Sequence, residues 1–164
     1  MPDYKIPAQT RIGHVHLKVS NLQRSLDFYC GLLGFELMVN YGDSAAFISA
    51  GGYHHHIGLN TWHSKNSPPA PEQAPGLYHT AILYPERKDL AEILKRLIDA
   101  KYQITGASDH GVSEAIYLND PDENGVELYW DRPREQWPTD EHGNFTMFTK
   151  RLDIEGLMTT LEEK

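Results

Sequence analysis

Along the first part of the chain, short stretches of alternating apolar and polar residues surround one stretch with helical spacing. The alternation over 12–19 is typical of a strand with one buried face. Apolar residues at helical spacing then predict a helix over 22–33, with Ser20 as its N-terminal cap and Gly34 at its end. Three further strands are expected, separated by Gly-Asp and Gly-Gly turns, over 35–41, 45–50 and 53–61. These patterns predict a β-α-β-β-β module.

The same order of elements recurs further along the chain. Several prolines in 64–75 prevent a helix or sheet from continuing, and the next strand is expected over 79–84 and the next helix over 88–100. Three more strands are expected over 102–105, 114–118 and 126–130. One such unit has a single apolar sheet face and needs a partner to bury it. We therefore expect an α+β protein in which two tandem βαβββ modules form a half-open barrel with a concave floor.

These patterns divide the chain into five parts. They are a leader over 1–11, module one over 12–63, a Pro-rich linker over 64–77, module two over 78–131 and a C-terminal extension over 132–164. The extension is polar and irregular except for a short amphipathic stretch, 153–161. We expect it to pack on the domain or on a second subunit.

Composition and charge narrow the range of partners. The 164 residues carry a net charge of -8 and no Lys/Arg cluster, which disfavours nucleic acid and anionic membrane surfaces. No apolar run approaches the roughly 18 residues of a membrane span, and the first residues lead into no apolar signal core. We therefore expect a cytoplasmic protein with a small ligand. The single cysteine, Cys30, lies in the first expected helix, where packing is a more common role than nucleophilic chemistry.

Two histidines and one glutamate occupy strands that otherwise look buried. His14 and His79 open the first strand of each module, and Glu127 lies in the last strand of module two between Val126 and Leu128. Taken singly, each also fits a plainer role, as a hydrogen-bonded core histidine or a solvent-facing glutamate. Under the repeat, however, both imidazoles reach the same concave floor, and a metal ion would remove the cost of burying the carboxylate. Two imidazoles and one carboxylate hold a divalent metal and leave positions open.

The chain resembles the vicinal oxygen chelate superfamily, which includes glyoxalase I, extradiol dioxygenases, fosfomycin-resistance enzymes and bleomycin-binding proteins. The resemblance spans 12–130 and rests on the motifs at 13–15, 25–29 with 33–35, and 119–122 with 125–128. It implies that the modules surround a metal site whose ligands are His14, His79 and Glu127. The chain is especially similar to the shorter catechol 2,3-dioxygenase-like proteins, although well-known extradiol enzymes have four modules and this chain has two.

Three further residues resemble the active-site residues of extradiol dioxygenases. His56, the last of three consecutive histidines, falls near the position that pairs with Glu127 under the repeat, where glyoxalase I-like members carry a glutamate as fourth ligand. A neutral imidazole there suits proton transfer. Tyr117 and His110 resemble a tyrosine and a histidine that hydrogen-bond substrate or intermediate. Plainer roles stay open, because consecutive strand residues alternate faces, tyrosine packs well in strands and Asp-His-Gly also fits a turn.

The leading interpretation is a metal-dependent extradiol-type dioxygenase that cleaves a catechol-like aromatic with O2. The resemblance implies a non-haem Fe(II) enzyme, with Mn(II), Ni(II) or Zn(II) as alternative metals, and a homodimer is a candidate assembly. A glyoxalase-like isomerase or lyase is the first alternative, and it needs a metal ligand at position 56. A metal-free binding protein of the bleomycin-resistance kind is the second, and in it the three ligand residues would be apart or blocked.

Overall fold

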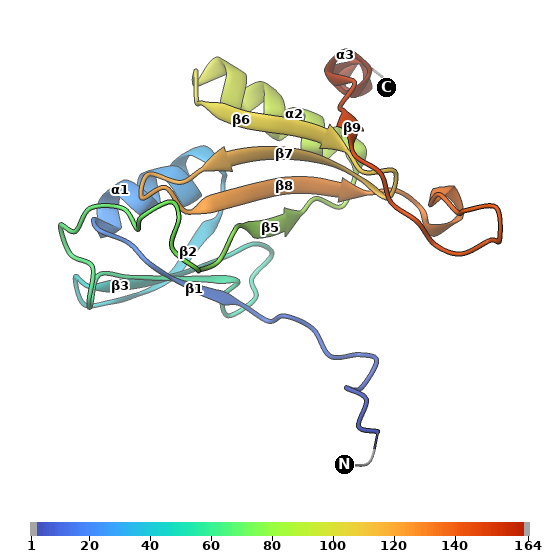
Figure 1. Ribbon diagram of the computed structural model, residues 1–164. Helices are drawn as coiled ribbons and strands as arrows, with labels where there is room; N and C mark the ends of the chain where they lie inside the picture. The colour runs from blue at the N-terminus through green and yellow to red at the C-terminus, as the bar shows by residue number, and fades with distance from the viewer. Residues whose placement is uncertain (1–2, 163–164) are drawn as a thin grey trace. The chain divides into compact units, whose positions relative to one another are not determined.

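The computed structural model describes residues 3–162, which belong to two compact units divided between Ser67 and Pro68. The first unit contains β1 (Val15–Lys18), α1 (Leu22–Leu26), a π-helical turn η1 (Asp27–Leu32), β2 (Glu36–Tyr41), β3 (Ala45–Ser49) and β4 (Ile57–Asn60). Its sheet has the order β1-β4-β3-β2, with β1 parallel to β4 and the other pairs antiparallel (Figure 1). We call β1 to β4 module one. Leu17, Tyr29, Ile48 and Leu59 are among its buried core side chains.

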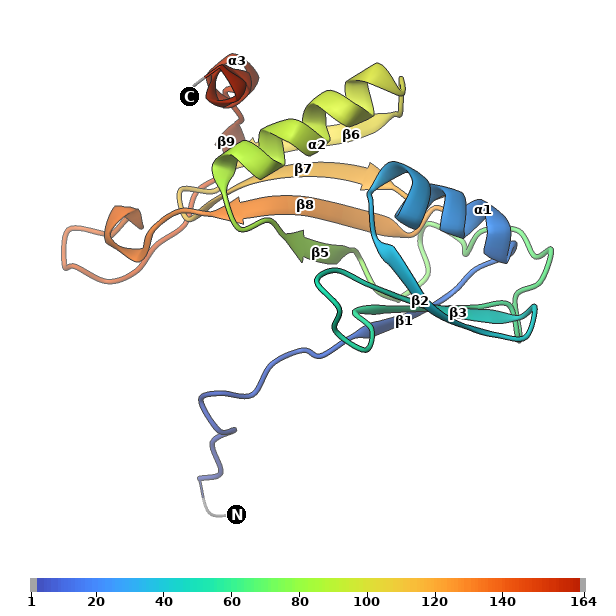
Figure 2. The same cartoon turned by 180° about the vertical axis from the view of Figure 1, so that it is seen from behind.

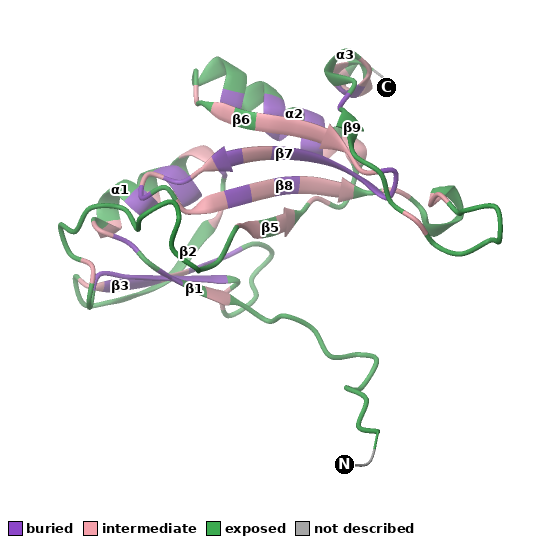
Figure 3. Ribbon diagram, viewed as in Figure 1, coloured by how far each residue is buried: buried purple, intermediate pink, exposed green. Residues whose placement is uncertain are grey.

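The second unit begins with the same five elements, which we call module two. They are β5 (Thr80–Leu83), α2 (Arg87–Asp99), β6 (Ile104–Asp109), β7 (Ser113–Asn119) and β8 (Gly125–Asp131). A reciprocal pair of hydrogen bonds between Glu86 and Asp89 caps the start of α2. Leu90, Leu94 and Leu97 of α2 are buried, and the helix covers one face of the sheet (Figure 2). In Figure 3, β7 is buried over most of its length, as expected for a central strand.

The C-terminal segment packs on the second unit. It contains η2 (Arg134–Gln136), β9 (Lys150–Arg151), α3 (Ile154–Met158) and η3 (Thr159–Leu161). β9 pairs with β6 and extends the sheet to the order β5-β8-β7-β6-β9. Leu152 and Leu157 are buried, so the amphipathic stretch uses its apolar side within this chain. The extension was expected to pack either on the domain or on a second subunit, and residues 150–161 pack on the domain.

The predicted α+β class and the repeated βαβββ order are confirmed, while several boundaries differ. Asn21, not Ser20, caps the first helix, because the Asn21 side chain accepts the Arg24 backbone N–H. The strand expected over 53–61 begins only at Ile57, because residues 53–56 form an irregular stretch with bends at His54 and His56 after the Gly51-Gly52 turn. The sheets are two separate hydrogen-bonded sheets, and the half-open barrel that would join them stays a prediction.

The strand expected over 102–105 is shifted towards the C-terminus. Tyr102 lies in the turn that follows α2, where its backbone N–H donates to the Leu97 carbonyl and its hydroxyl donates to the Asn119 carbonyl. β6 therefore begins at Ile104 and runs to Asp109. None of the helices in residues 3–162 is long and apolar enough to cross a membrane.

Candidate metal centre

Module two brings His79 and Glu127 into direct contact. β5 and β8 are parallel, with Ala81 opposite Glu127, so His79, two residues before Ala81, lies on the same face as the carboxylate. The His79 Nε2 atom lies 2.8 Å from Glu127 Oε2, and the two side chains are 32% and 13% exposed. His79 Nδ1 is buried and has no hydrogen-bond partner among the described residues, so Nε2 is the nitrogen that meets the carboxylate.

Tyr117 and His110 extend this pair into a continuous row. Tyr117 is directly opposite Glu127 in the antiparallel β7–β8 ladder, and its hydroxyl donates to Glu127 Oε1 at 3.0 Å. His110 follows β6 in a turn that Gly111, with φ of 78°, allows, and its Nε2 atom lies 2.7 Å from the Tyr117 oxygen. The turn expected over residues 109–111 is thus present, and it brings His110 to Tyr117, while the active-site role of His110 stays a prediction. We call these four residues, His79, Glu127, Tyr117 and His110, the module-two row.

Module one has different side chains at the equivalent ladder position. Val15 pairs with Ile57 as Thr80 pairs with Val126, so Gly58 is the residue equivalent to Glu127. The sequence interpretation put His56 near this position, and the ladder corrects it, since His56 is equivalent to Gly125. A Cβ atom on Gly58 would lie 2.9 Å from the ring of His16, its neighbour on β1. The imidazole of His16 fills the space that a side chain at 58 would need.

His14 lies directly before β1, as His79 lies before β5, within a group of aromatic rings. Its ring packs on His55, with the ring centroids 4.4 Å apart, and His55 Nδ1 lies 2.8 Å from His54 Nδ1. His56 points elsewhere: its Nδ1 atom contacts Ser49 Oγ at 3.0 Å and accepts the Ala50 N–H. The residue that contacts His14 is therefore His55, which the sequence interpretation passed over.

Residues 11–128 match the family described as "Glyoxalase/Bleomycin resistance protein/Dioxygenase superfamily". The chain belongs to this superfamily. The predicted resemblance is confirmed. Among solved structures, a glyoxalase/dioxygenase from Nostoc punctiforme superposes with a TM-score of 0.63 at 18% identity, covering 79% of this chain and 99% of that one. At that identity the structural likeness shows the fold of the superfamily.

Two curated members of the superfamily are similar in sequence. The chain is 44% identical over 154 residues to the catechol-2,3-dioxygenase of Bacillus subtilis (strain 168), covering 93% of this chain and 53% of that protein. It is 30% identical over 124 residues to biphenyl-2,3-diol 1,2-dioxygenase 2 of Rhodococcus globerulus, covering 76% of this chain and 64% of that protein. The chain thus spans about half the length of the first relative and under two thirds of the second.

The electrostatics of this superfamily member favour a cation beside Glu127. Burial and the negative charge of Glu127 raise the pKa of the Tyr117 phenol well above its ordinary value. The same two causes raise the pKa of the Asp131 carboxyl. Burial, Asp131 and Glu127 also raise the pKa of Tyr129. Negative charge is therefore disfavoured around Glu127, and a bound cation would relieve that repulsion.

The spacing of His79 and Glu127 also fits two ligands of one ion. Nitrogen and oxygen ligands about 2.1 Å from a first-row metal and about 90° apart lie about 3.0 Å from each other. The observed 2.8 Å between His79 Nε2 and Glu127 Oε2 is close to this value. No group of three or more His, Cys, Asp or Glu side chains in a metal-binding arrangement occurs within residues 3–162. Two of the three predicted ligands are thus together in module two, and the participation of His14 stays a prediction.

The imidazoles around His14 are suited to bind as neutral donors. Burial, with His14 as a neighbour, lowers the pKa of His16 and of His55. A histidine with a lowered pKa is uncharged at neutral pH, and the neutral ring has the lone pair that a metal or a proton needs. The row of histidines at 54–56 could have indicated His55, but the sequence does not say which of three adjacent rings turns towards β1.

Proposed function

We propose that the chain is a metal-dependent extradiol-type dioxygenase that cleaves a catechol-like aromatic ring with O2. The observation that carries this proposal is the module-two row, which places a proton-carrying tyrosine and histidine directly beside a pair of candidate metal ligands. The names of the curated relatives support the reaction class, since both are dioxygenases for aromatic diols. The combination is what ring cleavage needs: metal ligands next to groups that accept and return protons.

His14, His79 and Glu127 are the proposed ligands, and Fe(II) is the proposed metal, with Mn(II), Ni(II) and Zn(II) as alternatives. When bound, such an ion would supply open coordination positions for a catecholate and O2. The donor set fits this role, because two imidazoles and one carboxylate leave part of the coordination sphere free. The fit in module two rests on the His79–Glu127 spacing and on the repulsion that Glu127 causes among its neighbours.

The proposed work of the protein side chains is to hold and move protons. Tyr117 stays protonated because its pKa is raised, so its hydroxyl is a hydrogen-bond donor towards oxygen atoms at the centre. His110 donates its Nε2–H to the same hydroxyl, so it can return a proton that Tyr117 has passed on. His56 remains a proposed acid–base residue. Its neighbour His55, which contacts His14, is an added candidate for that role.

Gly58 favours a three-ligand centre over the four-ligand centre of a glyoxalase-like enzyme. The fourth ligand of that alternative would come from the position equivalent to Glu127 in module one. A glycine supplies no donor there, and the adjacent His16 ring excludes a longer side chain. His56 lies two residues before this position, and its Nδ1 atom contacts Ser49 Oγ and accepts the Ala50 N–H.

The test combines metal analysis with turnover. The full chain is purified without oxygen, its metal content is measured, and O2 uptake and ring-cleavage products are followed with a panel of catechols. We expect bound iron, O2 uptake and a yellow ring-opened product. Isomerisation of a thiol adduct without O2 uptake would favour the glyoxalase-like alternative, and a protein that takes up no metal would favour the binding protein.

Glu127→Gln gives the matched loss-of-metal variant. It keeps the size of the side chain and removes the charge, so metal affinity should fall by at least about 100-fold, given that even residues behind the ligands contribute 10- to 100-fold. Glu92→Gln, at an exposed position of α2, is the control and should bind metal as the wild type does. Unchanged metal content in Glu127→Gln would overturn the proposed ligand set.

A further inference from the structure

We propose that Thr149, in the segment that follows the repeated modules, is a positioning residue that fixes the tautomer of His110. Its Oγ1 atom lies 3.1 Å from His110 Nδ1, on the opposite side of the ring from Tyr117. The inference rests on the proposed function, because it assigns His110 a proton-transferring role. It concerns a residue outside the stretch of 11–128 that matches the superfamily.

The direction of the hydrogen bonds assigns the proton on His110. A phenol has one hydrogen, and Tyr117 donates it to Glu127, which as a carboxylate only accepts. The contact between His110 Nε2 and the Tyr117 oxygen must therefore use the N–H of His110 as donor. A neutral imidazole carries one N–H, so Nδ1 of the same ring is an acceptor. The Thr149 hydroxyl is the donor that faces it.

The hydrogen bonds consequently form a chain in one direction, from Thr149 through His110 and Tyr117 to Glu127. Each member donates to the next, and chains of this kind strengthen one another in a partly buried environment. Without the Thr149 hydroxyl, Nδ1 would lose the donor that faces it, and the alternative tautomer with its proton on Nδ1 would no longer be disfavoured. In that tautomer Nε2 has no hydrogen to give, so Tyr117 would lose its donor.

The backbone on both sides of Thr149 is held in place although the residue itself is exposed. The Phe148 N–H donates to the His110 carbonyl at 3.3 Å, and Lys150 pairs with Asp109 in the β6–β9 ladder. These contacts tie the segment to the same turn that contains His110. Thr149 is thus presented to the imidazole by backbone contacts rather than by its own burial.

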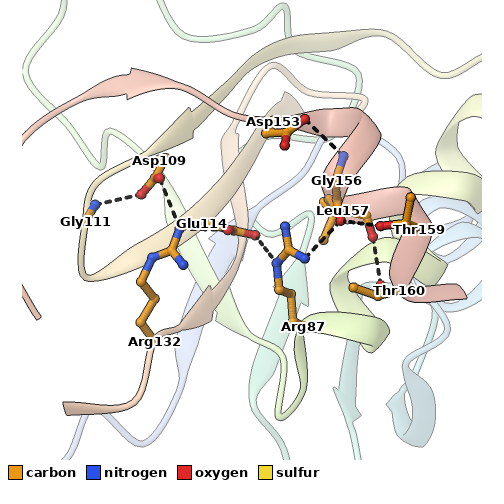
Figure 4. Close-up of polar contacts among 10 residues, drawn as sticks. All are labelled: Arg87, Asp109, Gly111, Glu114, Arg132, Asp153, Gly156, Leu157, Thr159 and Thr160. Atoms are coloured by element: carbon orange, nitrogen blue, oxygen red, sulfur yellow. Dashed lines mark hydrogen bonds and ion pairs between the residues drawn. The ribbon is translucent and has the colours of Figure 1, made fainter. Parts of the chain in front are cut away.

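A partly buried ionic network links this turn to α3 (Figure 4). Glu114, whose side chain is 4% exposed, accepts from Arg87 and from Arg132, each at 2.7 Å. Arg132 also contacts Asp109, which receives the Gly111 N–H, and Arg87 donates to the Gly156 carbonyl. The network therefore links α2, β6, β7 and α3, and it includes Asp109 and Gly111, the two neighbours of His110.

Nitrogen NMR of the imidazole tests the inference without any metal. In metal-free full chain, at a pH where His110 is neutral, the two ring nitrogens have distinct shifts that report which one is protonated. We expect the Nε2–H form in the wild type and in Thr149→Ser, and a mixture of both forms in Thr149→Val. Thr139→Val, an exposed threonine of the same segment, is the matched control and should keep the wild-type form.

Turnover by the metal-loaded protein gives the second reading. In Thr149→Val, kcat should fall by about 3- to 10-fold with KM nearly unchanged, as expected for the loss of one hydrogen bond that positions a residue. Thr149→Ser should restore it. An unchanged tautomer in Thr149→Val, or failure of serine to restore the wild-type form, would overturn the inference. A chain that turns over no catechol would reject the proposed function, while the tautomer would still decide the role of Thr149.

Discussion

Modules one and two have the same fold and place different chemistry at the same ladder position. In module two, Ala81, Glu127 and Tyr117 lie side by side on three neighbouring strands. In module one the equivalent residues are His16, Gly58 and Phe47. In module two the first strand has the small residue, Ala81, and the last strand has the carboxylate of Glu127. In module one the order is reversed: the first strand has the imidazole of His16, and the last strand has the small residue, Gly58.

This difference shows how a repeated backbone can carry a carboxylate in one module and none at the equivalent position of the other. In module two the carboxylate is held by one hydrogen bond from Tyr117 and by contact with His79. In module one the His16 and Phe47 rings meet edge to face, with centroids 5.7 Å apart, beside a glycine. At this position module one therefore has packed rings where module two has a hydrogen-bonded carboxylate. The repeat therefore supplies two similarly placed histidines and only one glutamate.

The largest expected effect comes from making module two resemble module one. Tyr117→Phe removes the hydroxyl that donates to Glu127 and accepts from His110, so kcat should fall by about 100-fold, the lower end of what acid–base groups contribute. Steady-state kinetics with a catechol measures this. Tyr41→Phe, at an exposed position of β2, is the control. A Tyr117→Phe protein as active as the control would remove Tyr117 from the mechanism.

An intermediate effect is expected from the reverse change in module one. Gly58→Glu places a Cβ atom 2.9 Å from the His16 ring, and we expect this overpacking to lower the free energy of unfolding by about 2 kcal/mol. Urea denaturation measures the loss. Adding His16→Ala should recover at least about 1 kcal/mol, because the two residues compete for the same space. If Gly58→Glu unfolds like the wild type, the ring does not fill that position.

The smallest effect on stability and turnover is expected from adding a hydroxyl in module one, where no carboxylate lies opposite it. Phe47→Tyr gives module one the tyrosine of module two, but Gly58 lies opposite it. The free energy of unfolding should change by less than about 1 kcal/mol, and catechol turnover should stay the same. A clear change in turnover would mean that the module-one ladder takes part in the chemistry.

The order of elements could be predicted from the sequence because strand alternation and helical spacing are local patterns. The register of the ladders could not, since the segment from Val15 to Ile57 is shorter than the segment from Thr80 to Val126. The sequence interpretation therefore put His56 near the position equivalent to Glu127, whereas pairing across the strands gives Gly58. The strand boundary at Ile57 was missed because residues 53–56 stand between a turn and an apolar run, where strand residues are expected, whereas they form an irregular stretch with bends.

The candidate site could be predicted from the sequence for residues in the repeated strands, and not for a residue in the segment that follows them. His79 and Glu127 carry the signal of a polar residue in an apolar strand, and the structure brings them into contact. Thr149 carries no such signal, since an exposed threonine in an irregular segment looks ordinary. Its contact with His110 depends on β9 pairing with β6 far back in the chain, which no local pattern reports.

The most direct test of the metal centre is the metal affinity of His14→Ala, measured by Fe(II) titration under anaerobic conditions. His14 is the proposed ligand from module one, and His142→Ala, whose side chain is 74% exposed, is the matched control. We expect His14→Ala to bind Fe(II) at least about 100-fold more weakly than the wild type, and His142→Ala to bind it equally well. Wild-type affinity in His14→Ala would contradict a centre shared by the two modules.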